Sequence, residues 1–350
     1  MGFVRDCFFC GLVLWFGLLS GCGPTVSRIE VLQAPADGPR WPAPPEPARI
    51  RYVTAFSGVK DVAPEPSRAQ RTFRLVTGQK QEEVPLVNPF AVAADGEGGV
   101  WVTDTGAAVV HFFDLAARRV SHFSRVGDLT LVTPAGIAFD AGRDQLFLAD
   151  ADLGRVFRLD RSGRLLGELR PPQGFARPGG VAVDAGGRVF VTDVQNGIVQ
   201  IFAPDGSHLR ALGSARNADR RFNRPIAVAI GGQGQVAVLD AMNFRVELFS
   251  PDLRSLGVVG GLGDGPGRFA RPRGLAFDSH QHLYVADAAF DNVQIFDNQG
   301  ELLLYFGGPG SQPGRLCLPA GLFIDGQDRI YAVDVCNFRV QVFEYLQGKE

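Results

Sequence analysis

An aspartate recurs six times between residues 104 and 334, at intervals of 43 to 47 residues, and each copy closes a short apolar run. Such a carboxylate can act as a general acid or base, or it can accept hydrogen bonds from backbone N–H groups of the following turn. A structural requirement recurs in every copy of a repeat, whereas a catalytic requirement does not. We therefore predict a structural role in turns for all six residues: Asp104, Asp150, Asp193, Asp240, Asp287 and Asp334.

Arginines and asparagines flank the same apolar runs. A guanidinium group is permanently charged and carries several donors, so a face that gathers such groups can bind an anionic partner. We expect most of these side chains to be solvated or paired with the turn aspartates, and the Asn residues to support the turns. The candidate binding face consists of Arg224, Arg245, Arg271, Arg273, Arg339, Asn243 and Asn337.

Histidines offer little metal chemistry in this sequence. There are five, and only His280 and His282 are spaced closely enough to share an ion, on a turn between two apolar runs. Two ligands on a mobile turn make a weak site. No Ser/His/Asp arrangement, phosphate-binding glycine loop or haem-attachment motif is visible either. We therefore expect no catalytic residue, no metal ligand and no cofactor.

The elements that position these residues are repeated strands. A proline opens each repeat, near residues 89, 134, 178, 225, 272 and 319. Each repeat holds four apolar runs of four to seven residues, separated by Gly, Asp and Asn turns, which is typical of antiparallel strands. The first two runs are apolar almost throughout, so both faces of these strands should be buried. The pattern predicts an all-β, six-bladed β-propeller over residues 49–350.

The repeats resemble the NHL repeat family. The match is clearest in "RPRGLAFDSHQHLYVADAAFDNVQIFDNQG" (271–300) and in "RPGGVAVDAGGRVFVTDVQNGIVQIFAPDG" (177–206). The resemblance covers about residues 88–345, and it implies the propeller fold rather than an activity. Enzymes of similar architecture include peptide-amidating lyases, with a histidine-rich zinc site, and lactonases with a calcium site; this chain lacks both ligand sets at the expected loops.

In this fold Arg273 should face the axis of the ring. It directly follows the proline of its repeat, and there a single Arg can hold an anionic group. An ion pair with a neighbouring carboxylate is the alternative. The other repeats carry small or apolar residues at this position: Phe90, Ala135, Gly179, Ile226 and Ala320.

Closure of the ring requires a strand from near the N-terminus, because the sixth repeat ends too early to supply its fourth strand. Two segments are candidates. We favour 72–78, because Val76 in this segment stands 13 residues before Pro89, as Phe306 stands 13 residues before Pro319. The segment 49–58 would then be an added edge strand or a cover.

Cys317 and Cys336 are expected to form a disulfide. If Ile324 lies opposite Ile330, Cys317 falls opposite Asn337, one residue from Cys336. Closing a loop of this length contributes about 3 kcal/mol in the chain-entropy model. The alternative is a pair of buried free thiols.

The N-terminus resembles that of a bacterial lipoprotein. A 13-residue apolar run precedes "LSGC" (19–22), which resembles a lipobox, so residues 1–21 are expected to be a signal peptide and Cys22 the lipidated residue. Residues 22–48 contain seven prolines and are expected to form an extended tether. Gly23 after the cysteine resembles the pattern for sorting to the outer membrane, in the periplasm or on the surface.

These features predict a binding module rather than an enzyme. The net charge of −2 excludes the basic footprint of a nucleic-acid partner. We expect a monomeric lipid-anchored scaffold in the bacterial envelope that binds a protein or peptide, as an accessory subunit of a surface or electron-transfer assembly. The alternatives are a metal-dependent propeller enzyme, similar to a lyase or lactonase, and a sensor of small anions.

Overall fold

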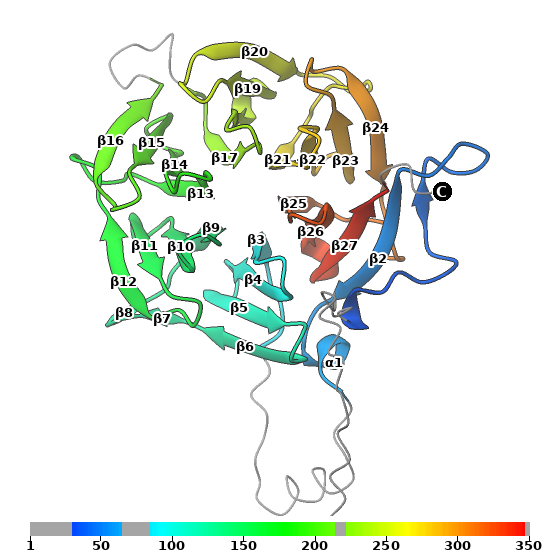
Figure 1. Ribbon diagram of the computed structural model, residues 1–350, viewed down its shortest axis with the longest axis horizontal. Helices are drawn as coiled ribbons and strands as arrows, with labels where there is room; N and C mark the ends of the chain where they lie inside the picture. The colour runs from blue at the N-terminus through cyan, green and yellow to red at the C-terminus, as the bar shows by residue number, and fades with distance from the viewer. Residues whose placement is uncertain (1–29, 65–83, 214–221, 347–350) are drawn as a thin grey trace, which may run out of the picture.

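The computed structural model describes residues 30–64, 84–213 and 222–346, and these form six antiparallel sheets around one axis (Figure 1). Five sheets have four strands and the sixth has five, so the predicted six-bladed propeller is confirmed. Within each blade the first strand lies at the axis and the fourth at the rim. The first strands of neighbouring blades contact each other around the whole ring, including β25 (Pro319–Ile324) with β3 (Pro89–Ala94).

The first three blades follow the repeats in chain order. A two-stranded ribbon, β7 and β8, joins the first blade to the second. Their strands are β3 (Pro89–Ala94), β4 (Gly99–Asp104), β5 (Val109–Asp114) and β6 (Arg119–Phe123); β7 (Arg125–Val126) and β8 (Leu129–Thr130); β9 (Pro134–Asp140), β10 (Gln145–Asp150), β11 (Arg155–Leu159) and β12 (Leu165–Leu169); β13 (Pro178–Val183), β14 (Val189–Asp193), β15 (Ile198–Phe202) and β16 (His208–Leu212).

The last three blades continue the pattern, and the sixth takes its outer strands from the N-terminal part of the chain. Their strands are β17 (Pro225–Ile230), β18 (Val236–Asp240), β19 (Arg245–Phe249) and β20 (Ser255–Gly260); β21 (Pro272–Phe277), β22 (Leu283–Asp287), β23 (Asn292–Phe296) and β24 (Leu302–Gly307); β25 (Pro319–Ile324), β26 (Arg329–Asp334), β27 (Arg339–Tyr345), β2 (Ile50–Phe56) and β1 (Arg40–Trp41).

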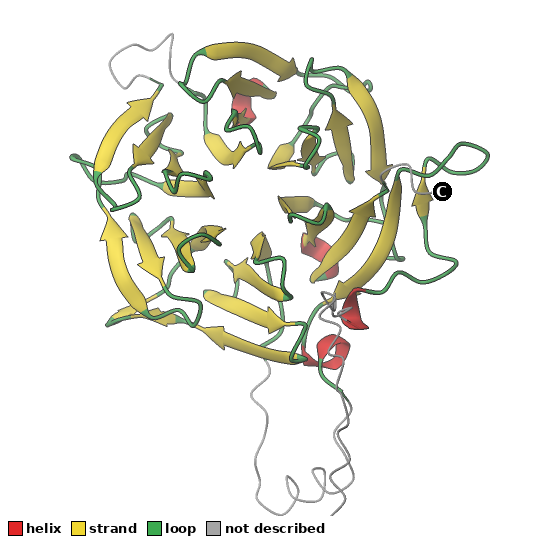
Figure 2. Ribbon diagram, in the orientation of Figure 1, coloured by secondary structure: helices red, strands yellow, loops and turns green. Residues whose placement is uncertain are grey.

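Helical structure is sparse in the described residues (Figure 2). It comprises the short helix α1 (Val59–Val62) and the single-turn segments η1 (Glu30–Leu32), η3 (Ala241–Asn243) and η4 (Val335–Asn337). None of these helices has the length or the apolar character needed to cross a membrane.

The core is divided among the joints between blades. Among the described residues there are six clusters of buried apolar side chains, and each cluster draws on two neighbouring blades. The second strands supply much of it; β14, β18 and β22 are buried at every position. This is why their sequences are apolar without alternation, since both faces of each strand pack against another sheet.

The ring is closed by β2, not by the favoured segment 72–78, which lies outside the described residues. β2 pairs antiparallel with β27, with Ile50 opposite Tyr345 and Phe56 opposite Val340, and so occupies the fourth-strand position of the sixth blade. Figure 1 shows β2 and β27 side by side. The sequence spacing predicted the wrong segment. The closing strand and its partner β27 are separated by nearly three hundred residues along the chain, and the repeat spacing does not determine which residues pair at that separation.

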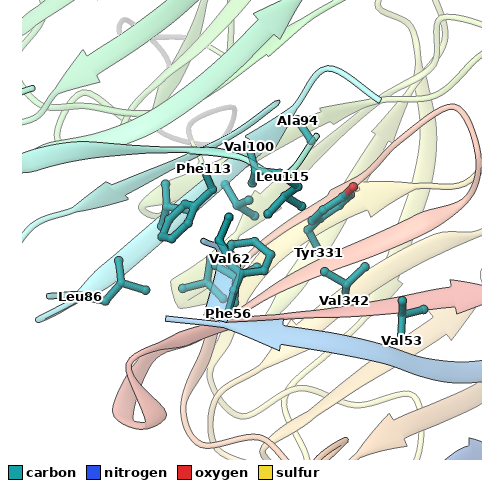
Figure 3. Packing of buried hydrophobic residues seen from close by; sticks show 14 of the residues in the cluster. Val53, Phe56, Val62, Leu86, Ala94, Val100, Phe113, Leu115, Tyr331 and Val342 are labelled. Carbon is teal, nitrogen blue, oxygen red and sulfur yellow. The ribbon is translucent and has the colours of Figure 1, made fainter. Parts of the chain in front are cut away.

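The joint beside β2 is filled by aromatic and aliphatic groups (Figure 3). Phe56 is 1% exposed, and its ring centroid lies 4.8 Å from that of Phe113 in the first blade. Val62 from α1 packs into the same cluster. The closing strand therefore joins the first and sixth blades by side-chain packing as well as by backbone pairing.

Part of the proline-rich segment lies against the propeller. β1 adds a fifth strand to the sixth blade, with Trp41 opposite Ile50. The Trp41 ring is 5.8 Å, between centroids, from both Phe306 and Phe343. Val31 and Leu32 also pack at the joint of the first and sixth blades, so the described part of residues 22–48 lies against the propeller.

The predicted disulfide forms between Cys317 and Cys336, whose Cα atoms are 5.5 Å apart. Ile324 lies opposite Ile330 as expected, but a bulge between Leu322 and Pro319 shifts the register by one residue. The shift places Cys317 directly opposite Cys336, and the backbone N–H of Cys336 donates to the carbonyl of Cys317 at 3.3 Å.

Candidate binding site at the axial channel

The recurrent aspartates tie together the two loops that form one face of the ring, which we name the aspartate face. It contains the loops that enter the first strands and the turns that leave the second strands. The Asp104 carboxylate accepts hydrogen bonds from the N–H groups of Val87 and Asn88 in one loop, at 2.6 and 3.0 Å. It also accepts from Gly106 and Ala107 in the other, both at 2.9 Å.

The same arrangement recurs around the ring. Asp287 accepts from Ala270, Arg271 and Ala289, and Asp150 accepts from Val132, Thr133 and Leu153. All six carboxylates are fully buried. Sequence reasoning identified the turn that follows each aspartate but not the loop before the proline, which is brought close only by pairing of the two strands.

Both asparagines assigned to the binding face donate hydrogen bonds to these carboxylates, and two of its arginines form ion pairs with them. Asn243 donates to Asp240 at 2.7 Å, and Asn337 donates to Asp334 at 2.9 Å. Arg339 donates to Asp334 at 2.7 Å, while Arg245 lies 3.6 Å from Asp240 and donates to Glu247 at 2.6 Å. Asn337 and Arg339 also donate to carbonyl groups of the loop between the fifth and sixth blades. All four side chains therefore form part of the structural network of the face.

Arg224 and Arg271 lie at the same face with exposed side chains. Each directly precedes the proline of its repeat, and the backbone N–H of Arg271 donates to Asp287 at 3.0 Å. Within the described residues neither guanidinium group makes a hydrogen bond or ion pair. They add positive charge around the channel without being fixed by a carboxylate.

Arg273 occupies a different environment. It lies at the bulge between Pro272 and Gly274, where an extra residue re-aims a side chain, and it lines a cavity of about 70 Å³ at the axis. The side chain is half-buried, and the described residues provide it with no hydrogen bond and no ion pair. The ion pair between Arg273 and a neighbouring carboxylate, which was the alternative from the sequence, is therefore not formed within the described residues.

The remaining walls of the cavity are apolar or consist of backbone. First strands of all six blades contribute to it, with side chains such as Phe90, Val92, Ile137 and Ile226. Burial lowers the pKa of the Arg273 guanidinium, and the positive charge of Arg271 lowers it further. A half-buried cation without a counter-charge is a site where an anionic group recovers Coulomb energy in a medium less polar than water.

Glycine keeps the channel narrow. A Cβ atom added at Gly136 would lie 2.0 Å from the carbonyl oxygen of Gly179, and one added at Gly274 would lie 2.1 Å from that of Ala320. Both contacts are with backbone of the next blade, which cannot move aside without opening the ring. The small residues seen in the first runs are thus required by close packing at the axis.

The histidines do not gather at the channel. His111 and His122 lie opposite each other on β5 and β6, and His208 on β16 contacts Gln200 at 2.8 Å. His280 and His282 lie on the turn between β21 and β22, at the face opposite the aspartates. Among the described residues no three His, Cys, Asp or Glu side chains are grouped as metal ligands.

Comparison with solved structures finds other propellers. The chain is similar to a streptogramin B lyase (TM-score 0.56, 13% identity, covering 75% of this chain and 95% of that chain). It is also similar to the Kuenenia stuttgartiensis hydrazine synthase (0.53, 13%, 75% and 96%) and to a chain of the nidogen/laminin complex (0.54, 20%, 70% and 89%). At these identities the likeness shows the fold alone.

Comparison with sequences adds one family. No curated protein matches the chain. The model of the NHL repeat matches residues 175–202, which span the first three strands of the third blade. The chain is therefore a six-bladed β-propeller that carries an NHL repeat.

Proposed function

We propose that this protein is a binding module of the bacterial cell envelope, anchored through lipid at Cys22, that receives a carboxylate or similar anionic group of its partner at the mouth of the axial channel. The observation that carries the proposal is the half-buried Arg273 guanidinium, which has no counter-charge among the described residues and lies among apolar walls. Arg224 and Arg271 on the same face favour the approach of a negatively charged partner.

This site suits a protein or peptide partner better than a free metabolite. The cavity at Arg273 is small, about 70 Å³, so it admits a single anionic group rather than a whole multi-ring ligand. A side-chain or C-terminal carboxylate is such a group, and the aspartate face around it offers a rigid surface for the rest of the partner. Propeller chains can bind proteins, as the name of the nidogen/laminin complex indicates for that neighbour.

Enzymatic activity is the alternative, and likeness to the streptogramin B lyase favours it. That likeness extends to the fold only, at 13% identity. The described residues at the channel supply an arginine but no His or Glu that could act as a base beside it. We therefore retain binding as the function.

The test compares three substitutions in purified protein: Arg273→Ala, Arg273→Lys and, as a matched control, Arg210→Ala, whose exposed side chain lies on the outer strand β16. Thermal melting is followed with acetate, succinate, citrate and phosphate at constant ionic strength. We expect an anion to raise the melting temperature of the wild type and of Arg210→Ala, to raise that of Arg273→Lys less because the ammonium group keeps only the charge, and to leave that of Arg273→Ala unchanged. Equal shifts in all variants would contradict the proposal.

A second arm distinguishes a free anion from a carboxylate on a macromolecule. Membranes are solubilised, and the wild type and Arg273→Ala are used as baits for affinity capture. A protein retained by the wild type and lost from Arg273→Ala supports a protein partner. Anion shifts without any such protein support the small-anion sensor instead.

A further inference from the structure

A polar cluster lies on the opposite face of the ring, at the joint between the fifth and sixth blades. Its centre is the turn of residues 278–282 between β21 and β22, which we name the histidine turn. It carries His280 and His282, and the Tyr345 ring of β27 lies 5.6 and 5.7 Å from the two imidazoles, between centroids. The sequence suggested only two histidines on a turn; the structure adds the groups that orient them.

Hydrogen bonds assign the tautomer of His282. Its Nδ1 lies 2.7 Å from Oδ2 of the buried Asp278. A carboxylate only accepts, so Nδ1 carries the proton and Nε2 keeps its lone pair in the neutral ring. Asp278 is itself fixed by the N–H groups of His280 and His282 and by the hydroxyl of Tyr284. This is the carboxylate–histidine arrangement that orients metal-binding imidazoles.

His280 has the same tautomer for a different reason. The Ser279 hydroxyl donates its single proton to Asp328 of the sixth blade at 2.8 Å. The same oxygen is 3.1 Å from Nδ1 of His280, so it must accept there, and Nδ1 of His280 must donate. The Nε2 atom of His280 therefore also keeps its lone pair, and the His280 side chain is exposed to solvent.

The separation of the two rings is close to that of two ligands on one ion. Their centroids are 5.9 Å apart, with 13° between the ring planes. With metal–nitrogen bonds of about 2.1 Å and a tetrahedral angle, an ion bound by two Nε2 atoms holds the ring centroids about 5 Å apart, so the rings must approach each other by about 1 Å on binding. His282 has a side chain 21% exposed, so its free edge reaches solvent where an ion can arrive.

We propose that His280 and His282 bind one divalent transition-metal ion through their Nε2 atoms, with the remaining coordination positions open to water or to an added ligand. Imidazole nitrogen suits Cu²⁺, Ni²⁺ and Zn²⁺, whereas Ca²⁺ and Mg²⁺ require oxygen ligands. Affinity should follow the usual order, with Cu²⁺ bound more tightly than Zn²⁺. The site is independent of Arg273, which lies at the other face.

The experiment is a calorimetric titration of the purified full chain, without a polyhistidine tag, with Cu²⁺ alone and with Zn²⁺ alone. The variants are His280→Ala, His282→Ala and the double substitution. His122→Ala is the matched control, because His122 is also an exposed histidine with a second imidazole beside it, 6.2 Å away between centroids. Electron paramagnetic resonance of the Cu²⁺ form counts the nitrogen ligands.

We expect one Cu²⁺ per chain, a weaker Zn²⁺ isotherm, and a spectrum with two imidazole nitrogens. Either single substitution should weaken binding at least about tenfold, and the double substitution should abolish it, while His122→Ala binds like the wild type. His280→Ala removes an exposed side chain, so its melting temperature without metal should stay that of the wild type. Absence of stoichiometric binding in the wild type, or its survival in the double variant, would overturn the site.

Discussion

At the scale of single residues, the aspartate face depends on buried carboxylates that each hold two loops. Replacing Asp287 by alanine leaves the N–H groups of Ala270, Arg271 and Ala289 without their acceptor. Since unsatisfied buried donors cost about 1–3 kcal/mol, we expect a loss of about 2–4 kcal/mol in the free energy of unfolding.

Urea denaturation measures that loss, with Asp264→Ala as the control. Asp264 is exposed and accepts no hydrogen bond within the described residues, so its replacement should change stability by less than about 0.5 kcal/mol. Similar effects of the two substitutions would show that the carboxylate of Asp287 has no structural role.

The carboxylate of Asp104 leads to a pH prediction. Burial by itself raises the pKa of this carboxyl, but the neighbouring His111 imidazole, whose Nε2 is 3.8 Å away, and hydrogen bonds from the N–H groups of Val87, Ala107 and Asn88 outweigh it and lower the pKa to about 2. A carboxyl with a lowered pKa stabilises the fold fully above its unfolded value of 3.8, and that stabilisation disappears as the pH falls towards 2.

The measurement is the difference in unfolding free energy between the wild type and Asp104→Asn across pH. It should be constant from pH 8 to pH 5 and shrink by about 2 kcal/mol between pH 4 and pH 2. A difference that grows on acidification has the wrong sign for this interpretation.

At the scale of elements, β2 is the strand on which closure depends. Phe56→Ala removes a fully buried ring from the joint of the first and sixth blades and should cost about 3–5 kcal/mol. Leu209→Ala, on the outer strand β16, is the control because that side chain is 52% exposed. Thermal melting followed by circular dichroism separates the two; equal melting temperatures would mean that β2 does not close the ring.

Much of this architecture can be predicted from the sequence pattern. The parts that cannot be predicted depend on contacts between residues far apart in the chain. Repeat spacing and buried apolar runs predicted the blades, because each blade is built from hairpins whose partners are near in the chain. The closing strand was assigned wrongly, since the pairing of Ile50 with Tyr345 leaves no local signal. The disulfide partners were predicted, but the bulge that sets their register was not.

The same distinction applies to the candidate sites. The sequence distinguished Arg273 because the other five repeats carry a small or apolar residue after the opening proline. Only the structure shows that no described carboxylate pairs with it. The histidine turn was dismissed because its orienting groups are not part of the motif. Asp278 is four residues from His282, and Asp328 comes from the next blade.

At the scale of the whole molecule, the proposed anchor determines where the two faces are presented. If Cys22 carries lipid, the wild type should be found in membranes with the added mass of the acyl chains, and Cys22→Ser should lack that mass. Membrane fractionation and the intact masses of the two proteins measure this. An unmodified mass at Cys22, or a wild type found in the soluble fraction, would refute the lipid anchor.

The most direct test of the binding proposal is anomalous diffraction from crystals soaked in bromide. Bromide is a small anion that fits a cavity of about 70 Å³, and its position is identified by its own scattering. We predict a peak beside the Arg273 guanidinium in the axial channel of the wild type, and no such peak in Arg273→Ala. An empty channel in wild-type crystals that hold bromide elsewhere would contradict the account.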